Sequence, residues 1–196
     1  MAVLKRALET TLAKIPGAHG AGAEQRILNL ACGRADETGV LADVFGREGE
    51  RLEIVGADIR SAEIEEANLR WGTAKGNDMH TRFHVEDGKR FLASMSSSER
   101  FDLTFMRHQN FWNNPVLWAQ MFEGALRQLS DDGLFVITSY FDVEHELACR
   151  KLTDLGAVKV AEHRNPHSRK LSDAPGKSVD RHIAVFQRPS PSGAGA

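Results

Sequence analysis

Cysteine is scarce in this chain, and long apolar runs are missing. Cys32 and Cys149 are its two cysteines, far apart among 196 residues and without a CxxC pair. This usage argues against a disulfide framework and favours a reducing compartment. No apolar run approaches the roughly 20 residues of a membrane span, and the N-terminal segment lacks the apolar core of an export signal. We therefore expect a cytoplasmic protein without membrane contact.

A large excess of charge of either sign is also missing. The formal net charge is -2 at pH 7. Binding to phosphate backbones needs clustered Lys and Arg, so this balance argues against nucleic acid as a partner. The eight histidines form no HxH, HExxH or Cys–His pattern with ligand spacing. No metal site is therefore expected.

The chain does have enough apolar residues for a core. Hydrophobic residues make up 41% of 196, which suits one globular domain. The pattern predicts an N-terminal helix and linker over residues 1–23, one domain over 24–188, and a disordered tail over 189–196. Residues 164–181 are expected to form a long polar loop, either a substrate lid or a solvated segment.

Short apolar segments alternate with amphipathic ones. Strands are expected at 27–31, 53–57, 82–85, 101–106, 134–140, 158–163 and 182–187, and helices at 3–14, about 37–47, 61–72, 89–95, 115–129 and 143–155. This order predicts an α/β fold with a mostly parallel sheet and helices on both faces. Ligands of such sheets bind beyond the carboxyl ends of the strands.

Three of these strand ends carry residues suited to a nucleoside. The small residues around Gly33 would let a ligand lie on the backbone near a helix N-terminus, or would simply form a tight turn. Asp58 follows at the spacing of a carboxylate that binds ribose hydroxyls, although a helix cap would explain it too. Asp87 would accept a bond from an adenine amino group, or only form a turn.

In their order and spacing these motifs resemble those of the class I S-adenosylmethionine-dependent methyltransferases. Asn29 stands where that family carries a carboxylate, and Ala31 and Ala35 replace two glycines. The resemblance implies a Rossmann-like, seven-stranded sheet that ends in an antiparallel hairpin. It also implies S-adenosylmethionine as the cofactor, bound by Asn29, Ala31, Cys32, Gly33, Asp58, Ile59, Arg60, Glu86, Asp87, Gly88 and Arg107.

The segment after the strand at 101–106 is dense in polar and aromatic groups. His108 titrates near neutrality and is the candidate catalytic base. Arg107 is the second candidate catalytic residue, since its fork suits a carboxylate or phosphate. Asn110, Trp112 and Tyr140 are candidate substrate-binding residues. In the alternative interpretation, His108 caps the sheet edge and Trp112 packs on the following helix.

The implied function is a methyltransferase that acts on a small molecule, and an anionic acceptor is one of the options left open. Three alternatives stay open. The first is a cofactor-binding or interaction module without catalysis, and the second is an RNA methyltransferase. The third is a nicotinamide-dependent oxidoreductase, although the chain lacks GxGxxG after its first strand. A homodimer is also left open.

Overall fold

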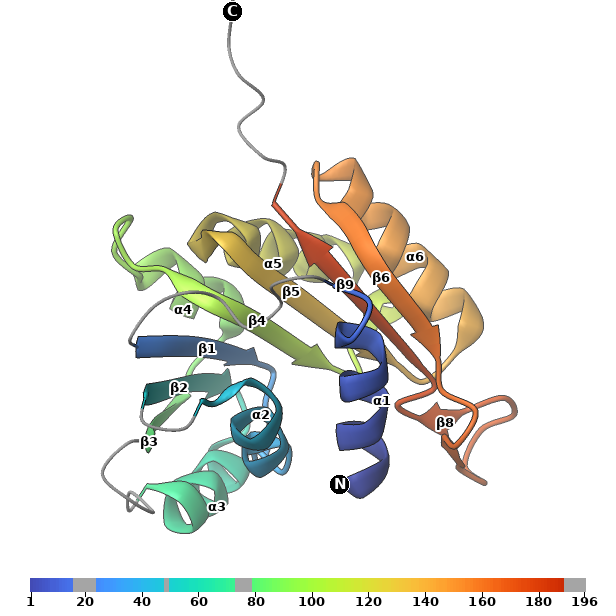
Figure 1. Ribbon diagram of the computed structural model, residues 1–196, viewed down its shortest axis with the longest axis horizontal. Helices are drawn as coiled ribbons and strands as arrows, with labels where there is room; N and C mark the ends of the chain where they lie inside the picture. The colour runs from blue at the N-terminus through green and yellow to red at the C-terminus, as the bar shows by residue number, and fades with distance from the viewer. Residues whose placement is uncertain (16–23, 48–49, 73–78, 189–196) are drawn as a thin grey trace, which may run out of the picture.

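A seven-stranded sheet with the order β3-β2-β1-β4-β5-β9-β6 organises the chain (Figure 1). The computed structural model describes residues 1–15, 24–47, 50–72 and 79–188, so the expected linker up to residue 23 and the expected tail 189–196 lie outside the described residues. The strands are Glu24–Leu30 (β1), Arg51–Asp58 (β2), Met79–Val85 (β3), Phe101–Arg107 (β4), Leu129–Ser139 (β5), Val158–Arg164 (β6), Arg169–Lys170 (β7), Ser178–Val179 (β8) and His182–Gln187 (β9). The helices are Ala2–Leu12 (α1), Thr38–Phe45 (α2), Ser61–Trp71 (α3), Gly88–Ser94 (α4), Pro115–Gln128 (α5) and Asp142–Asp154 (α6), with the short 3-10 helix η1 at Phe111–Asn113.

The direction of the strands confirms the predicted fold class. Strands β1 to β5 pair in parallel, whereas β9 runs antiparallel to both β5 and β6. The last two expected strands therefore do form the reversed pair. Because β1 lies between β2 and β4, the strand order reverses at β1, and a ligand cleft is expected beyond its carboxyl end.

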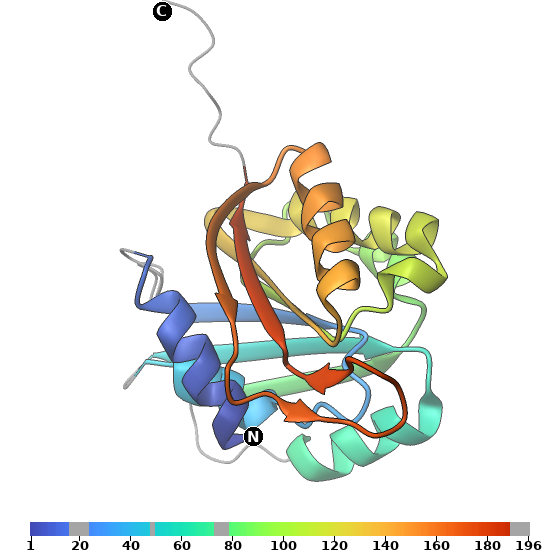
Figure 2. The same ribbon diagram turned by 90° about the vertical axis from the view of Figure 1, so that its right-hand side faces the viewer.

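Helices cover both faces of the sheet (Figures 1 and 2). One apolar cluster joins the sheet to α4, α5 and α6, through residues such as Leu92, Phe122 and Leu152. A second cluster joins the other face to α1 and α2, through residues such as Leu8 and Leu41. Buried apolar side chains on both faces explain why the central strands read as continuous apolar runs rather than alternating ones.

Two expectations about the chain between the elements were wrong. The strand expected at 134–140 begins earlier, because residues 130–133 also belong to β5, and the pairing of β5 with β4 shifts register between Phe101 and Leu103. The segment 164–181 contains the antiparallel pair β7 and β8 rather than only loop. Figure 2 shows this hairpin at the same end of the sheet as the N-terminal end of α1. Within the described ranges, no helix has the length and apolarity that a membrane crossing requires.

Candidate functional site

A cavity of about 1160 Å³ lies at the carboxyl ends of the parallel strands. Its volume is that of a site for a sizeable small molecule. The β7–β8 hairpin contributes Arg169, Leu171 and Val179 to the wall, and α1 contributes Met1, Val3 and Leu4. Most of the predicted site residues line it as well: Ala31, Cys32, Gly33, Asp58, Ile59, Arg60, Arg107, His108, Asn110 and Tyr140.

The loop between β1 and α2 forms the floor of this cavity. Ala31, Gly33 and Ala35 all have positive φ, at 53°, 53° and 51°. A Cβ atom on Gly33 would lie 2.8 Å from a guanidinium nitrogen of Arg60, so only glycine fits there without displacing that side chain. The small residues of the loop therefore serve both its left-handed turns and the close approach of a neighbouring group.

Asp58 connects this floor to the end of β2. Its carboxylate accepts from the Gly33 backbone N–H at 2.9 Å, from the Arg60 backbone N–H at 3.0 Å and from Arg60 Nε at 2.9 Å. Burial raises the pKa of the Asp58 carboxyl, but these bonds outweigh it and hold the pKa below its usual value. Asp58 is therefore an ionised acceptor, and the half-exposed Arg60 side chain covers it.

Glu37, which the sequence reading missed, places a second carboxylate in the cavity wall. It stands at the N-cap of α2 and is 3% exposed. Asn29 Nδ2 donates to Glu37 Oε1 at 2.7 Å, and Arg107 approaches Glu37 Oε2 at 3.5 Å. Burial raises the pKa of Glu37 despite both partners. Asn29 itself is fully buried and is absent from the cavity lining, so it holds Glu37 rather than facing a ligand.

Asp180 is the second residue that the sequence reading missed. It is 2% exposed, although it lies in the segment expected to be a polar loop. Its carboxylate accepts from Arg107 Nε at 3.0 Å and from Arg107 Nη2 at 2.8 Å, so the fork of Arg107 is used within the protein. The same carboxylate accepts from the Thr138 hydroxyl. Burial alone would raise the pKa of Asp180, but His108 and Arg107 lower it well below its usual value.

His108 packs between Asp180 and Tyr140. Its Nε2 lies 2.9 Å from Asp180 Oδ1 and 3.0 Å from the Asp180 backbone N–H. A protonated Nε2 donates to the carboxylate, whereas an unprotonated one accepts from the backbone, so the tautomer decides which bond forms. The Tyr140 ring stacks on His108 with centroids 3.8 Å apart, and Lys177 Nζ lies 4.8 Å from the Tyr140 centroid.

This environment keeps the His108 ring neutral. Burial lowers the pKa of His108 and outweighs the opposing effect of Asp180. His108 and Asp180 also share positive φ values of 57° and 51°. Such strain clusters at sites where the surrounding structure fixes an unusual geometry. The arrangement is a neutral imidazole beside a buried carboxylate, which suits proton abstraction.

Other predicted residues lie outside the cavity lining. Glu86, Asp87 and Gly88 are not part of it, and Asp87 Oδ1 instead caps α4 by accepting from the backbone N–H groups of Lys89 and Arg90. Trp112 is also absent from the lining, and its ring packs against Phe141 with centroids 4.8 Å apart. Trp118 of α5 lines the cavity instead.

Comparisons with known proteins agree with this fold. The profile of a family described as "Methyltransferase domain" matches residues 22–178. No curated protein matches the sequence. Among solved structures, the N-methyltransferase NodS from Bradyrhizobium japonicum WM9 is 17% identical with a TM-score of 0.62, covering 94% of this chain and 96% of that chain.

Further solved structures share the fold at low identity. The sugar N-methyltransferase KedS8 from Streptoalloteichus is 13% identical with a TM-score of 0.61, covering 96% of this chain and 87% of that one. An rRNA methylase from Streptococcus thermophilus is 11% identical with a TM-score of 0.61, covering 91% and 95%. The family match selects methyl transfer over the nicotinamide-dependent and non-catalytic alternatives. The chain therefore belongs to the methyltransferase domain family and is an S-adenosylmethionine-dependent methyltransferase with the class I fold.

Proposed function

We propose that this enzyme methylates a small molecule that carries an anionic group. Arg169 lines the cavity from the hairpin and makes no ion pair with any residue in the described part of the chain. Arg34, Arg60 and Arg107, which line the cavity too, are each paired with carboxylates. Arg169 is thus the cavity arginine best placed to attract an anionic acceptor.

The residues of the cavity floor fit the cofactor. The ionised Asp58 would accept bonds from ribose hydroxyls in place of those from Arg60. Glu37 would face the ammonium of the methionine moiety, supplying the carboxylate that the family carries at the position of Asn29. Arg107 Nη1, which Asp180 does not bind and which lies 3.5 Å from Glu37 Oε2, would face the methionine carboxylate. The backbone of Ala31 to Gly33 would lie against the nucleoside.

His108 carries the proposed chemistry. S-adenosylmethionine supplies an electrophilic methyl group when bound. The neutral His108 ring accepts the proton that an amine or hydroxyl acceptor loses, and Asp180 stabilises the imidazolium that results. Asn110 and Tyr140 line the same region and would position the acceptor. Trp112, outside the lining, would take part only if the segment around η1 moves. The proposed anionic acceptor is carried by Arg169 in the cavity wall, and the proposed proton transfer by the partly buried His108, whose Nε2 lies 2.9 Å from Asp180 Oδ1.

Two aspartates that follow neighbouring strands allow a matched test of the cofactor site. Asp58→Asn removes a charged acceptor in the cavity and should weaken binding of S-adenosylhomocysteine by about tenfold or more, measured by calorimetry. Asp87→Asn should leave both that affinity and the stability near the wild-type values, because asparagine caps a helix N-terminus about as well as aspartate does. An equal loss in both variants would instead support the adenine contact first expected of Asp87.

A second experiment tests the acceptor class. Methyl transfer is measured for small anionic amines and hydroxy acids, for their uncharged analogues, and for RNA. We expect turnover of an anionic small molecule, with a higher KM in Arg169→Gln and an unchanged affinity for S-adenosylhomocysteine. Methylation of RNA with steep salt dependence would contradict the proposal and favour the RNA alternative.

A further inference from the structure

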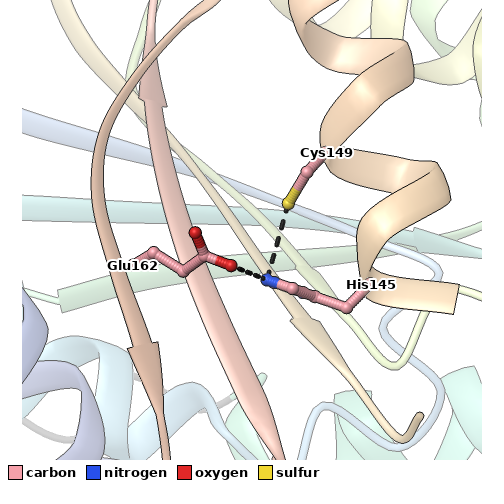
Figure 3. Close-up of side chains that lie close together, drawn as sticks. All are labelled: His145, Cys149 and Glu162. Atoms are coloured by element: carbon pink, nitrogen blue, oxygen red, sulfur yellow. Dashed lines mark hydrogen bonds and ion pairs between the residues drawn. The ribbon is translucent and has the colours of Figure 1, made fainter. Parts of the chain in front are cut away.

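Three potential metal ligands meet outside the cavity, between α6 and the edge strand β6 (Figure 3). His145 and Cys149 lie one helical turn apart on α6, and Glu162 faces them from β6. His145 Nε2 is 2.9 Å from Glu162 Oε1 and 3.5 Å from Cys149 Sγ. All the ligand atoms lie within 4.8 Å of one another.

The two contacts of His145 converge on one ring nitrogen. Figure 3 shows both dashed lines meeting at this atom. A neutral imidazole nitrogen carries either one proton or one lone pair, so it cannot serve both partners fully. Tetrahedral zinc, with bonds of about 2.0–2.3 Å, separates its ligand atoms by roughly 3.3–3.6 Å. The sulfur–nitrogen distance of 3.5 Å already has this value, and the nitrogen–oxygen distance is shorter by a few tenths of an ångström.

The other ring nitrogen is held in the way that metal-binding histidines require. Ser139 Oγ lies 3.0 Å from His145 Nδ1 and accepts from Gln109 Nε2 at 2.8 Å. When Nδ1 carries the proton and donates it to Ser139, the lone pair of Nε2 points at Cys149 and Glu162. A fixed outer partner of this kind orients the imidazole and selects its tautomer.

The three side chains differ in burial, so the cluster is open to solvent on the side of Glu162. His145 is 2% exposed and Cys149 is 7% exposed, whereas the Glu162 side chain is about two-fifths exposed. Lys159 Nζ binds Glu162 Oε2 at 2.5 Å and leaves Oε1 available to a cation. The positive charge of Lys159 nevertheless repels a cation at this site. The His182 ring stacks on His145 with centroids 4.5 Å apart, and its Nε2 pairs with Asp142.

We propose that His145 Nε2, Cys149 Sγ and Glu162 Oε1 bind a Zn²⁺-class divalent cation, with water as the fourth ligand on the exposed side. Thiolate, imidazole and carboxylate together suit zinc and its spectroscopic substitute Co²⁺. Binding forms the metal–sulfur bond and releases the Cys149 thiol proton to solvent. The bound ion would fasten α6 to β6 at the edge of the sheet. The site does not depend on the proposed function, since it lies outside the cavity.

Cobalt titration tests the site without any measurement of activity. Because the chain has two cysteines, a thiolate-to-cobalt absorption band must come from Cys149 or Cys32. We expect the band in the wild type and in Cys32→Ser, and its loss in Cys149→Ser. A wild type that shows no band at millimolar Co²⁺, or a band that survives in Cys149→Ser, would overturn the proposal.

Three further variants test the metal site even if Cys149→Ser folds poorly. Glu162→Gln changes a partly exposed side chain and should keep the band while weakening Co²⁺ affinity at least tenfold. Ser139→Ala should weaken it about 10- to 100-fold, as removal of an outer partner does. Lys159→Ala removes the opposing cation and should tighten binding. Unchanged affinity in all three variants would also refute the site.

Discussion

Left-handed backbone at single residues shapes both sides of the cavity. Ala31 and Ala35 adopt the φ values that glycine adopts without strain, close to that of Gly33 between them. Both alanines stand where the resembled family carries glycine, and a Cβ atom disfavours positive φ. The loop keeps the left-handed geometry nevertheless, so the two alanines lower stability but do not change the shape of the cavity floor.

Ala31→Gly should therefore stabilise the fold. Alanine at this positive φ costs about 1–2 kcal/mol of folding free energy, which the substitution recovers. The greater conformational freedom of glycine in the unfolded chain offsets about half of that gain. We expect a net gain of up to about 1 kcal/mol in the free energy of unfolding, measured by urea denaturation. The matched control Ala42→Gly, inside α2, should lose about 1 kcal/mol. A loss of similar size at both positions would contradict the role of φ.

Asp180 should act on the reaction through His108. Burial holds the pKa of His108 below 6.5, so the wild-type rate should fall as the pH drops through that lowered pKa. Asp180 raises the pKa of His108, so removal of the Asp180 carboxylate should shift the acid limb of the pH–rate profile to lower pH. We expect Asp180→Asn to show this displacement together with a lower kcat.

A hairpin aspartate provides the control for this pH profile. Asp173 is exposed and pairs with Lys177, so Asp173→Asn should keep the wild-type acid limb. If Asp180→Asn loses activity but keeps the same limb, Asp180 has a structural role only.

At the scale of elements, apolar periodicity predicted the main sheet and helices. The strand at His182–Gln187 was placed with the bounds observed, and the other main strands differ by a few residues at their ends. The strands β7 and β8 were missed because two-residue strands carry no periodic signal. Glu37 and Asp180 were missed because an acidic residue in a polar segment resembles a surface residue. Their burial depends on partners far away in sequence, such as Arg107.

Helix α1 covers one side of the cavity, and its attachment depends on few residues. Leu8 is fully buried against the cluster that contains α2 and the sheet, whereas Val3 is 43% exposed. Leu8→Ala should cost about 2–5 kcal/mol of unfolding free energy, since it leaves a cavity in that cluster. Val3→Ala should change it by less than about 0.5 kcal/mol. The free energy of unfolding of both variants is measured by thermal and by urea denaturation. If Leu8→Ala and Val3→Ala lower it equally, α1 does not pack as described.

At the scale of the whole molecule, two buried groups whose pKa values are shifted in opposite directions should reduce the pH dependence of the free energy of unfolding. Burial raises the pKa of Glu144 to about 7 and lowers that of His145 to about 4. The contribution of Glu144 is complete below its unfolded pKa of about 4.5 and is lost as the pH rises through about 7. The contribution of His145 is complete above about 6.5 and is lost as the pH falls through about 4. Between these limits the two slopes have opposite signs.

Glu144→Gln removes one of the two slopes. We expect the variant to gain stability relative to the wild type as the pH rises from 4.5 to 7.5, measured by urea unfolding at several pH values. Glu146→Gln, on the exposed side of the same helix, should follow the wild-type profile. Parallel curves for Glu144→Gln and the wild type would mean that this carboxyl titrates normally in the fold.

The position of β9 has a consequence for the newly made chain. β9 lies between β5 and β6 in the sheet, yet it follows both in sequence. During synthesis, β6 therefore leaves the ribosome before the strand that joins it to the rest of the sheet. Until residues 182–187 emerge, β5 and β6 each present an unpaired edge, the kind of surface that chaperones shield and that aggregation exploits. The sheet of this methyltransferase can close only when that late strand arrives.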